Sequence, residues 1–131
     1  MKKLLLFLVL LSVTFTTNAQ WTQTNGPGGG YIKSLCSNGT NLFAVTHFGG
    51  GVFLSTNNGS SWISRNNGLT NTDVLSIVAS GTNLFVGTSG GGVFLSNNNG
   101  SSWTEVNIGL TSAFVYSLAV NGTNKIGRAH V

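Results

Sequence analysis

The apolar residues of this chain occur in short continuous runs separated by polar turn residues. Leu84-Phe85-Val86 and Val93-Phe94-Leu95 are two such runs, and each is bounded by Gly, Asn or Ser. Continuous apolar runs of this length, rich in β-branched and aromatic residues, predict β-strands that are covered on both faces. In the most complete part of the pattern we expect four strands, at residues 74–79, 83–88, 92–96 and 102–106.

This strand pattern repeats along the chain. The sequence GGGVFLSTNNGSSW at residues 49–62 returns as GGGVFLSNNNGSSW at residues 90–103, and Trp21, Trp62 and Trp103 are spaced 41 residues apart. A four-stranded antiparallel sheet repeated at such a period is typical of a β-propeller blade. The first unit covers residues 31–65, the third offers only residues 114–120, and residues 21–24 match a fourth strand that would complete the last blade of a ring. Because propellers need about four to eight blades, we predict an all-β propeller fragment with about two four-stranded antiparallel blades plus the start of a third.

The polar turn before each later tryptophan has the pattern S-x-N-x-G-x-x-W. The serine and asparagine side chains are expected to hydrogen-bond turn amides, the glycine to take a positive φ, and the indole to fold back over the hairpin and become buried. These positions are Ser55, Asn57, Gly59 and Trp62 in the first copy and Ser96, Asn98, Gly100 and Trp103 in the second. The glycine triplets at 49–51 and 90–92 are predicted to be tight turns, because no Lys-Ser/Thr pair follows them as in a phosphate-binding loop.

The repeated turn resembles the Asp-box (BNR) motif, with Asn57 and Asn98 where that family usually has Asp. The resemblance implies a β-propeller of the sialidase-like and photosystem II assembly factor-like repeat proteins over roughly residues 21–124. Asparagine keeps the carbonyl acceptor and lacks the charge, so we expect the turn to be retained and cation binding to be weakened. The resemblance does not imply a photosynthetic role, because the name of the photosystem II assembly factor-like proteins is attached to the repeat and not to a shared function.

The two ends of the chain have sequences of a different kind. Residues 1–19 contain Lys2-Lys3, an apolar run and small residues before Gln20, which is typical of a secretory signal peptide. Residues 20–124 form the partial propeller. Residues 125–131, KIGRAHV, match the in-frame translation of a common sequencing adapter and replace the Leu-Phe pair that follows the same turn in the other copies. We therefore expect a secreted or periplasmic protein and assign no biological role to the last seven residues.

The charge of the chain comes largely from its ends. The formal net charge is +4, from six Lys or Arg and two acids. Without the signal and the last seven residues, Lys33 and Arg65 balance Asp73 and Glu105, so neither nucleic acid nor, after signal cleavage, a membrane is an expected partner. The one cysteine, Cys36, is expected to be a small core residue of a strand.

No catalytic, metal or cofactor site is predicted. Sialidase-like chemistry needs an arginine cluster, a tyrosine nucleophile paired with a glutamate, and an acid/base carboxylate. Arg65 stands alone, Asp73 and Glu105 fall in different contexts, and Tyr31 and Tyr116 are expected to be core residues near first strands. His47 is the one histidine outside the last seven residues, and no acidic cluster accompanies it.

A ligand-binding face is nevertheless suggested by the topology. Turns between second and third strands should lie on the same face as the crossovers between blades. The first of these turns is one residue longer than its copy, and such an irregularity is where we expect a ligand contact, although surface loops also vary freely. The candidate residues of this face are His47, Phe48, Asn71, Asp73 and Ser112.

The sequence thus favours an exported, non-catalytic β-propeller module for binding or scaffolding, with an unknown protein or carbohydrate ligand. Two alternatives remain open. One is a sialidase-like glycoside hydrolase whose active site lies in a missing C-terminal part, and the other is a periplasmic ligand-sensing propeller domain.

Overall fold

The computed structural model describes residues 23–121 and 125–128, so the predicted signal segment, Trp21 and residues 129–131 lie outside the described part. The described residues contain two four-stranded antiparallel sheets and one strand pair, and no helix. The first sheet consists of β1 (Ile32–Asn38), β2 (Asn41–Thr46), β3 (Gly51–Ser55) and β4 (Ile63–Ser64), in that order. The second consists of β5 (Val74–Ser80), β6 (Asn83–Thr88), β7 (Val93–Ser96) and β8 (Thr104–Glu105). The predicted all-β class and the two four-stranded units are confirmed.

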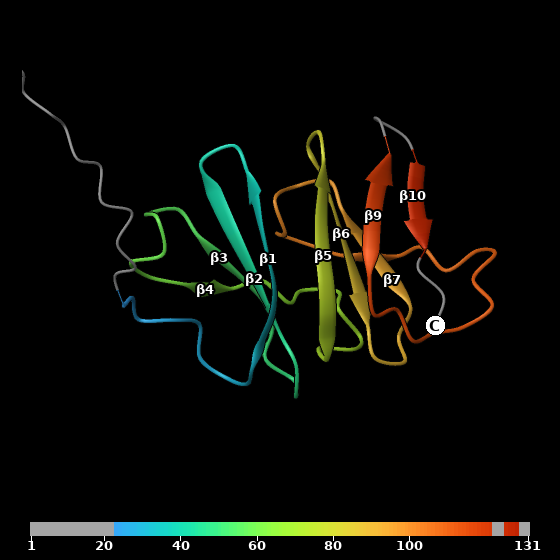
Figure 1. Ribbon diagram of the computed structural model, residues 1–131, viewed down its shortest axis with the longest axis horizontal. Helices are drawn as coiled ribbons and strands as arrows, with labels where there is room; N and C mark the ends of the chain where they lie inside the picture. The colour runs from blue at the N-terminus through green and yellow to red at the C-terminus, as the bar shows by residue number, and fades with distance from the viewer. Residues whose placement is uncertain (1–22, 122–124, 129–131) are drawn as a thin grey trace, which may run out of the picture.

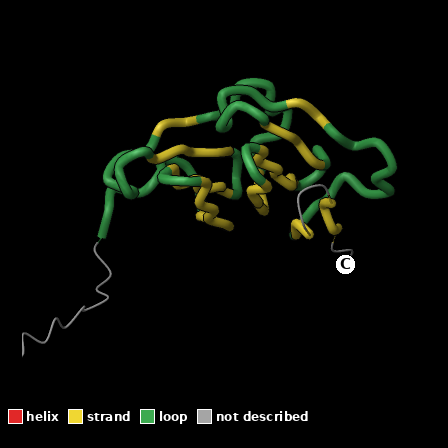
Figure 2. The backbone as a smooth tube through the Cα atoms, turned by 90° about the horizontal axis from the view of Figure 1, so that it is seen from above, coloured by secondary structure: helices red, strands yellow, loops and turns green. Residues whose placement is uncertain are grey.

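The sheets follow one another along the long axis of the molecule (Figures 1 and 2). The first strands lie innermost, because β5 packs against β1 and β2 of the first sheet and β9 (Leu118–Asn121) packs in turn against β5 and β6. The short fourth strands β4 and β8 are the outer edges. Inner first strands that adjoin from sheet to sheet are the arrangement of blades around a propeller axis.

The core lies between the sheets. Each sheet has a forward face, turned toward the next sheet in the chain, and a backward face, turned toward the preceding one. The forward face of the first sheet carries Phe43, Val45, Val52 and Leu54, and the backward face of the second carries Ile77, Leu84, Val86, Phe94 and Trp103. All of these residues are buried in one hydrophobic cluster. The forward face of the second sheet forms a smaller cluster with Val115 and Leu118. Both faces of the second sheet are therefore covered, as the continuous apolar runs predict.

The two sheets share irregularities as well as strands. The pairing of β1 with β2 shifts register between Ile32 and Ser34, and the pairing of β5 with β6 shifts between Val74 and Ser76. A bulge at the same point of each copy bends the inner strand in the same way. The fourth strands are shorter than predicted, since β8 has two residues where 102–106 was expected.

The third unit differs from the other two. β9 pairs with β10 (Lys125–Arg128), which falls in the segment to which we assign no biological role. In the first two sheets the turn closes with Asn38 opposite Asn41 and Ser80 opposite Asn83, whereas here Asn121 lies opposite Lys125. The pairing is thus displaced by one residue from the repeat. An unpaired strand edge accepts a following extended segment whether or not it continues the repeat.

Candidate functional site

The two serine–asparagine turns, at residues 55–62 and 96–103, have the same hydrogen bonds. Ser55 Oγ accepts from Gly59 N at 2.8 Å and donates to Asn57 Oδ1 at 3.0 Å. Asn57 Oδ1 also accepts from Ser61 N at 2.9 Å, and Asn57 Nδ2 donates to Ser61 Oγ at 2.8 Å. The equivalent bonds join Ser96, Asn98, Gly100 and Ser102 at 2.8–2.9 Å. The amide nitrogen thus makes a bond that a carboxylate could not donate.

Two consecutive residues of each turn are left-handed. Gly59 has φ 83° and Gly100 has φ 75°, and the preceding Asn58 and Asn99 both have φ 55°. Asparagine tolerates this region better than most side chains, which explains why Asn-Gly recurs here. The left-handed asparagine is a feature that we did not predict, although the Asn-Gly pair signals it.

The two indoles differ in their surroundings. Each lies over the glycine of its own turn, since Trp62 Cζ2 and Trp103 Cζ2 are within 3.7 Å of a Cβ built on Gly59 and Gly100. Trp103 is 4% exposed and its Nε1 donates to Arg65 O of the preceding sheet at 2.8 Å. Trp62 is only half-buried, so the expectation that both indoles are buried is wrong for this one. No sheet precedes the first one within the described residues, and the indole therefore lacks its cover.

Asn66 and Asn107 are structural residues that sequence reasoning missed. Asn66 Oδ1 accepts from Val52 N at 2.8 Å and its Nδ2 donates to Gly50 O at 3.0 Å. Asn107 makes the same bonds to Val93 N and Gly91 O, at 2.7 and 3.0 Å. Each amide therefore fixes the start of a third strand. The signal that could have found them is the 41-residue spacing, which the sequence also continues back to Asn25.

The candidate ligand face is formed by the turn between β2 and β3 and the crossover that leads to β5. Asp73 Oδ1 accepts from Phe48 N at 3.0 Å and contacts His47 Nδ1. The His47 and Phe48 rings stack with their centroids 4.0 Å apart. Phe48 has φ 64°, which is unfavourable for a residue of this size, yet its side chain is 69% exposed. The Asp73 carboxylate therefore bonds the backbone amide of an exposed aromatic residue whose φ is strained.

Tyr31 extends this face. Its ring meets the Phe48 ring edge to face with centroids 5.9 Å apart, and it is 72% exposed. The expectation that Tyr31 and Tyr116 are core residues is wrong, because Tyr116 is also exposed. Tyr31 precedes β1, and Tyr116 precedes β9 in the third unit, so neither lies inside a covered strand. We name the group of Tyr31, His47, Phe48 and Asp73 the aromatic cluster.

The two other candidate residues occupy equivalent places one unit apart. Asn71 Oδ1 accepts from Asp73 N at 2.9 Å, and Asn71 Nδ2 donates to Ser89 O at 3.0 Å. Ser112 Oγ accepts from Phe114 N at 3.2 Å. Asn71 thus braces Asp73 beside the aromatic cluster, whereas Ser112 braces the next crossover and lies outside the cluster.

The described side chains offer little for catalysis. Of the two carboxylates, Asp73 belongs to the aromatic cluster, and Glu105 on β8 accepts from Asn107 Nδ2 at 2.6 Å. Within residues 23–121 no group of three or more His, Cys, Asp and Glu side chains could hold a metal. Cys36 is half-buried against the core, and burial raises the pKa of its thiol. No described helix is long and apolar enough to cross a membrane.

Comparison with known proteins agrees with this architecture. No family model matches the chain, and no curated protein matches it. Among solved structures it is similar to an ancestral GH74 enzyme, with a TM-score of 0.60 and 26% identity, over 76% of this chain and 13% of that chain. The two sheets are β-propeller blades. The matched part of this chain thus spans about an eighth of the length of that GH74 enzyme.

Proposed function

We propose that this chain is part of an exported, non-catalytic Asp-box β-propeller that binds a carbohydrate through the aromatic cluster. The repeated serine–asparagine turns support the Asp-box assignment, because their hydrogen bonds form the compact bend that the motif requires. The apolar run before Gln20 supports export.

The observation that carries the proposal is the conformation of Phe48. A non-glycine residue with φ 64° costs about 1–3 kcal/mol, and such residues concentrate at functional sites. Burial of the ring does not offset this cost, since Phe48 is 69% exposed. The Asp73 carboxylate keeps it there through the Phe48 amide at 3.0 Å. Contact of the exposed Phe48 ring with a ligand would explain why a phenylalanine occupies a position with this backbone conformation.

A carbohydrate is the ligand class that fits this chemistry. The exposed Tyr31 and Phe48 rings offer flat apolar surfaces for the C–H face of a sugar, and the neighbouring His47 and Asp73 offer hydrogen-bonding groups for its hydroxyls. The similarity to a glycoside hydrolase points to the same class.

A binding role is favoured over hydrolysis by the carboxylates. Glycosidases of both stereochemical types generally use a pair of carboxyl groups about 5–9.5 Å apart across the scissile bond. In residues 23–121 Asp73 lies in a crossover loop, and Glu105 lies on the outer strand β8, where it is bound by Asn107. The second candidate function is glycoside hydrolysis, which the similarity to the GH74 enzyme favours. It requires a second carboxyl group, from outside the described residues, to act with Asp73.

Affinity electrophoresis of the full chain tests the proposal. Soluble β-glucan, xylan, galactomannan and sialylated oligosaccharides are cast separately into native gels. We expect at least one to retard the protein, and Phe48→Ala to weaken that retardation by about tenfold or more, as for a central aromatic contact. The matched control is Ile108→Ala, because Ile108 is fully exposed and lies outside the aromatic cluster.

Two outcomes would contradict the proposal. Equal retardation of the wild type and Phe48→Ala would place the ligand elsewhere. Release of reducing sugar from the retarding polysaccharide, abolished by Asp73→Asn, would favour the hydrolase instead.

A further inference from the structure

The turn that carries His47 and Phe48 has two described segments against it. Gly30, before β1, lies so close that a Cβ built on it would meet the His47 carbonyl oxygen. Asp73, before β5, accepts from Phe48 N at 3.0 Å. Phe48 is nevertheless 69% exposed. Its ring is thus open to solvent although both adjoining segments are in place.

The Tyr31 and Phe48 rings form an angled pair. Their planes are inclined by 66° and their centroids are 5.9 Å apart, and both side chains are largely exposed. A cation is attracted to the face of an aromatic ring when it lies within about 6 Å of the ring centroid. Because the two centroids are so close, one cation beside the pair can be within this range of both rings.

The polar atoms that the aromatic cluster leaves for a ligand are mainly acceptors. The Phe48 amide and His47 Nδ1 both contact Oδ1 of Asp73, so Asp73 Oδ2 has no partner among the described residues. A neutral His47 whose Nδ1 proton faces this carboxylate presents Nε2 as an acceptor. The Tyr31 hydroxyl can donate or accept. A ligand rich in donors therefore matches these atoms best.

The carboxylate also gives the cluster a negative charge. Among the described residues no lysine or arginine pairs with Asp73, whose ionic contact is with His47, a side chain charged only when protonated. The Asp73 side chain is 28% exposed, so a ligand can reach it. An acidic sugar would be repelled there. A protonated amine carries positive charge and several donors but no acceptor, so it suits the carboxylate, the imidazole and the rings together.

We propose that the aromatic cluster binds an amino sugar of a glucosamine oligosaccharide through its protonated amine. The ammonium group lies against the Tyr31 and Phe48 rings and donates to Asp73 Oδ2. The C–H face of the sugar covers the remaining exposed aromatic surface. The proposal rests on the proposed carbohydrate binding and narrows its ligand class to cationic sugars.

The test compares two pentasaccharides with the same backbone, the glucosamine pentamer and its fully N-acetylated form. Acetylation removes the charge of each amine and leaves the sugar rings unchanged. Isothermal titration calorimetry of the full chain at neutral pH measures both affinities. We expect the glucosamine pentamer to bind about tenfold more tightly, the value of one hydrogen bond to a charged group. Phe48→Ala should weaken the binding of both pentamers.

A pair of charge variants locates the source of this preference. Asp73→Asn removes the negative charge and keeps Oδ1 as the acceptor of Phe48 N, so it should abolish the preference for the glucosamine pentamer. The matched control is Glu105→Gln, which removes the same charge from β8, outside the aromatic cluster. Glutamine keeps the acceptor of Asn107 Nδ2. The control should retain the full preference.

Four results would overturn the proposal. They are equal affinity of the wild type for the two pentamers, a preference that survives in Asp73→Asn, and a preference lost to the same extent in Glu105→Gln. The fourth is Phe48-dependent binding of polylysine as tight as that of the glucosamine pentamer, which would indicate a basic protein segment as the ligand. The first comparison needs no variant, so it decides the matter even if Asp73→Asn fails to fold.

These measurements separate the amino-sugar proposal from the carbohydrate proposal on which it rests. Phe48-dependent binding of neutral sugars without any preference for the glucosamine pentamer would overturn the amino-sugar proposal alone. Absence of binding to both pentamers and to every polysaccharide in the native gels would overturn both proposals.

Discussion

At the scale of single residues, Phe48 has a backbone φ that phenylalanine disfavours. Glycine adopts φ 64° without the steric cost that a phenylalanine pays there, although it loses more entropy on folding. Phe48→Gly should therefore raise the free energy of unfolding by about 1 kcal/mol while weakening carbohydrate retardation. Urea denaturation followed by tryptophan fluorescence checks the first effect. A loss of more than about 2 kcal/mol would mean that the ring stabilises the fold.

Asn57 is the residue whose identity departs from the motif that its turn resembles. Asn57→Ala removes the acceptor of Ser61 N and Ser55 Oγ, so it should lower the free energy of unfolding by about 1–2 kcal/mol. Asn57→Asp keeps that acceptor, and the Ser61 hydroxyl can turn to donate to it. Its effect should stay within about 0.5 kcal/mol. Thermal unfolding of the two variants compares them, and an equal loss in both would show that the amide nitrogen dominates.

At the scale of elements, the two hairpins offer an internal comparison. Trp103→Phe leaves Arg65 O without its donor and reduces a buried contact, so it should cost about 2 kcal/mol. Trp62→Phe removes an N–H that has no partner in the described structure, so it should cost less than about 0.5 kcal/mol. Denaturant unfolding of both variants measures the difference. Equal costs would indicate that Trp62 Nε1 is bonded in solution.

The elements are also where sequence reasoning succeeded and failed. Apolar runs and the 41-residue period predicted both sheets, because strand pairing depends on local pattern and on turns that the repeat copies. The grouping of His47, Phe48 and Asp73 followed from topology. The exposure of Tyr31 and the partial exposure of Trp62 could not be predicted in this way. The burial of a side chain depends on which residues of the neighbouring unit pack against it. The longer turn marked the position of Phe48, but neither its positive φ nor its bond to Asp73 in another loop could be predicted from the local sequence.

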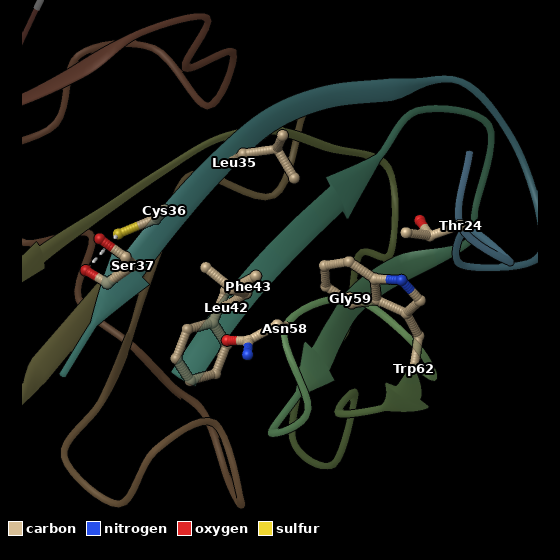
Figure 3. A pocket seen from close by; sticks show the side chains of 9 residues that line it. All are labelled: Thr24, Leu35, Cys36, Ser37, Leu42, Phe43, Asn58, Gly59 and Trp62. Carbon is tan, nitrogen blue, oxygen red and sulfur yellow. Dashed lines mark hydrogen bonds between the residues drawn. The ribbon is translucent and has the colours of Figure 1, made fainter. Parts of the chain in front are cut away.

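At the scale of the whole molecule, the uncovered backward face governs behaviour in solution. Leu35 and the half-buried Leu42 and Trp62 form an apolar patch that no other sheet of the described residues covers (Figure 3). We expect the chain to bind the dye 8-anilinonaphthalene-1-sulfonate and to associate as its concentration rises. Leu35→Asp should reduce the dye fluorescence, whereas Ile108→Asp should not. A dye-silent, monodisperse wild type would contradict this expectation.

The hydrogen bonds within the two serine–asparagine turns join only uncharged groups, namely serine hydroxyls, asparagine amides and main-chain N–H groups. Ionic screening weakens interactions between charges and leaves such neutral bonds almost untouched. Acid has no carboxylate to titrate there either. The two serine–asparagine turns should accordingly keep the same conformation at low and at high salt concentration.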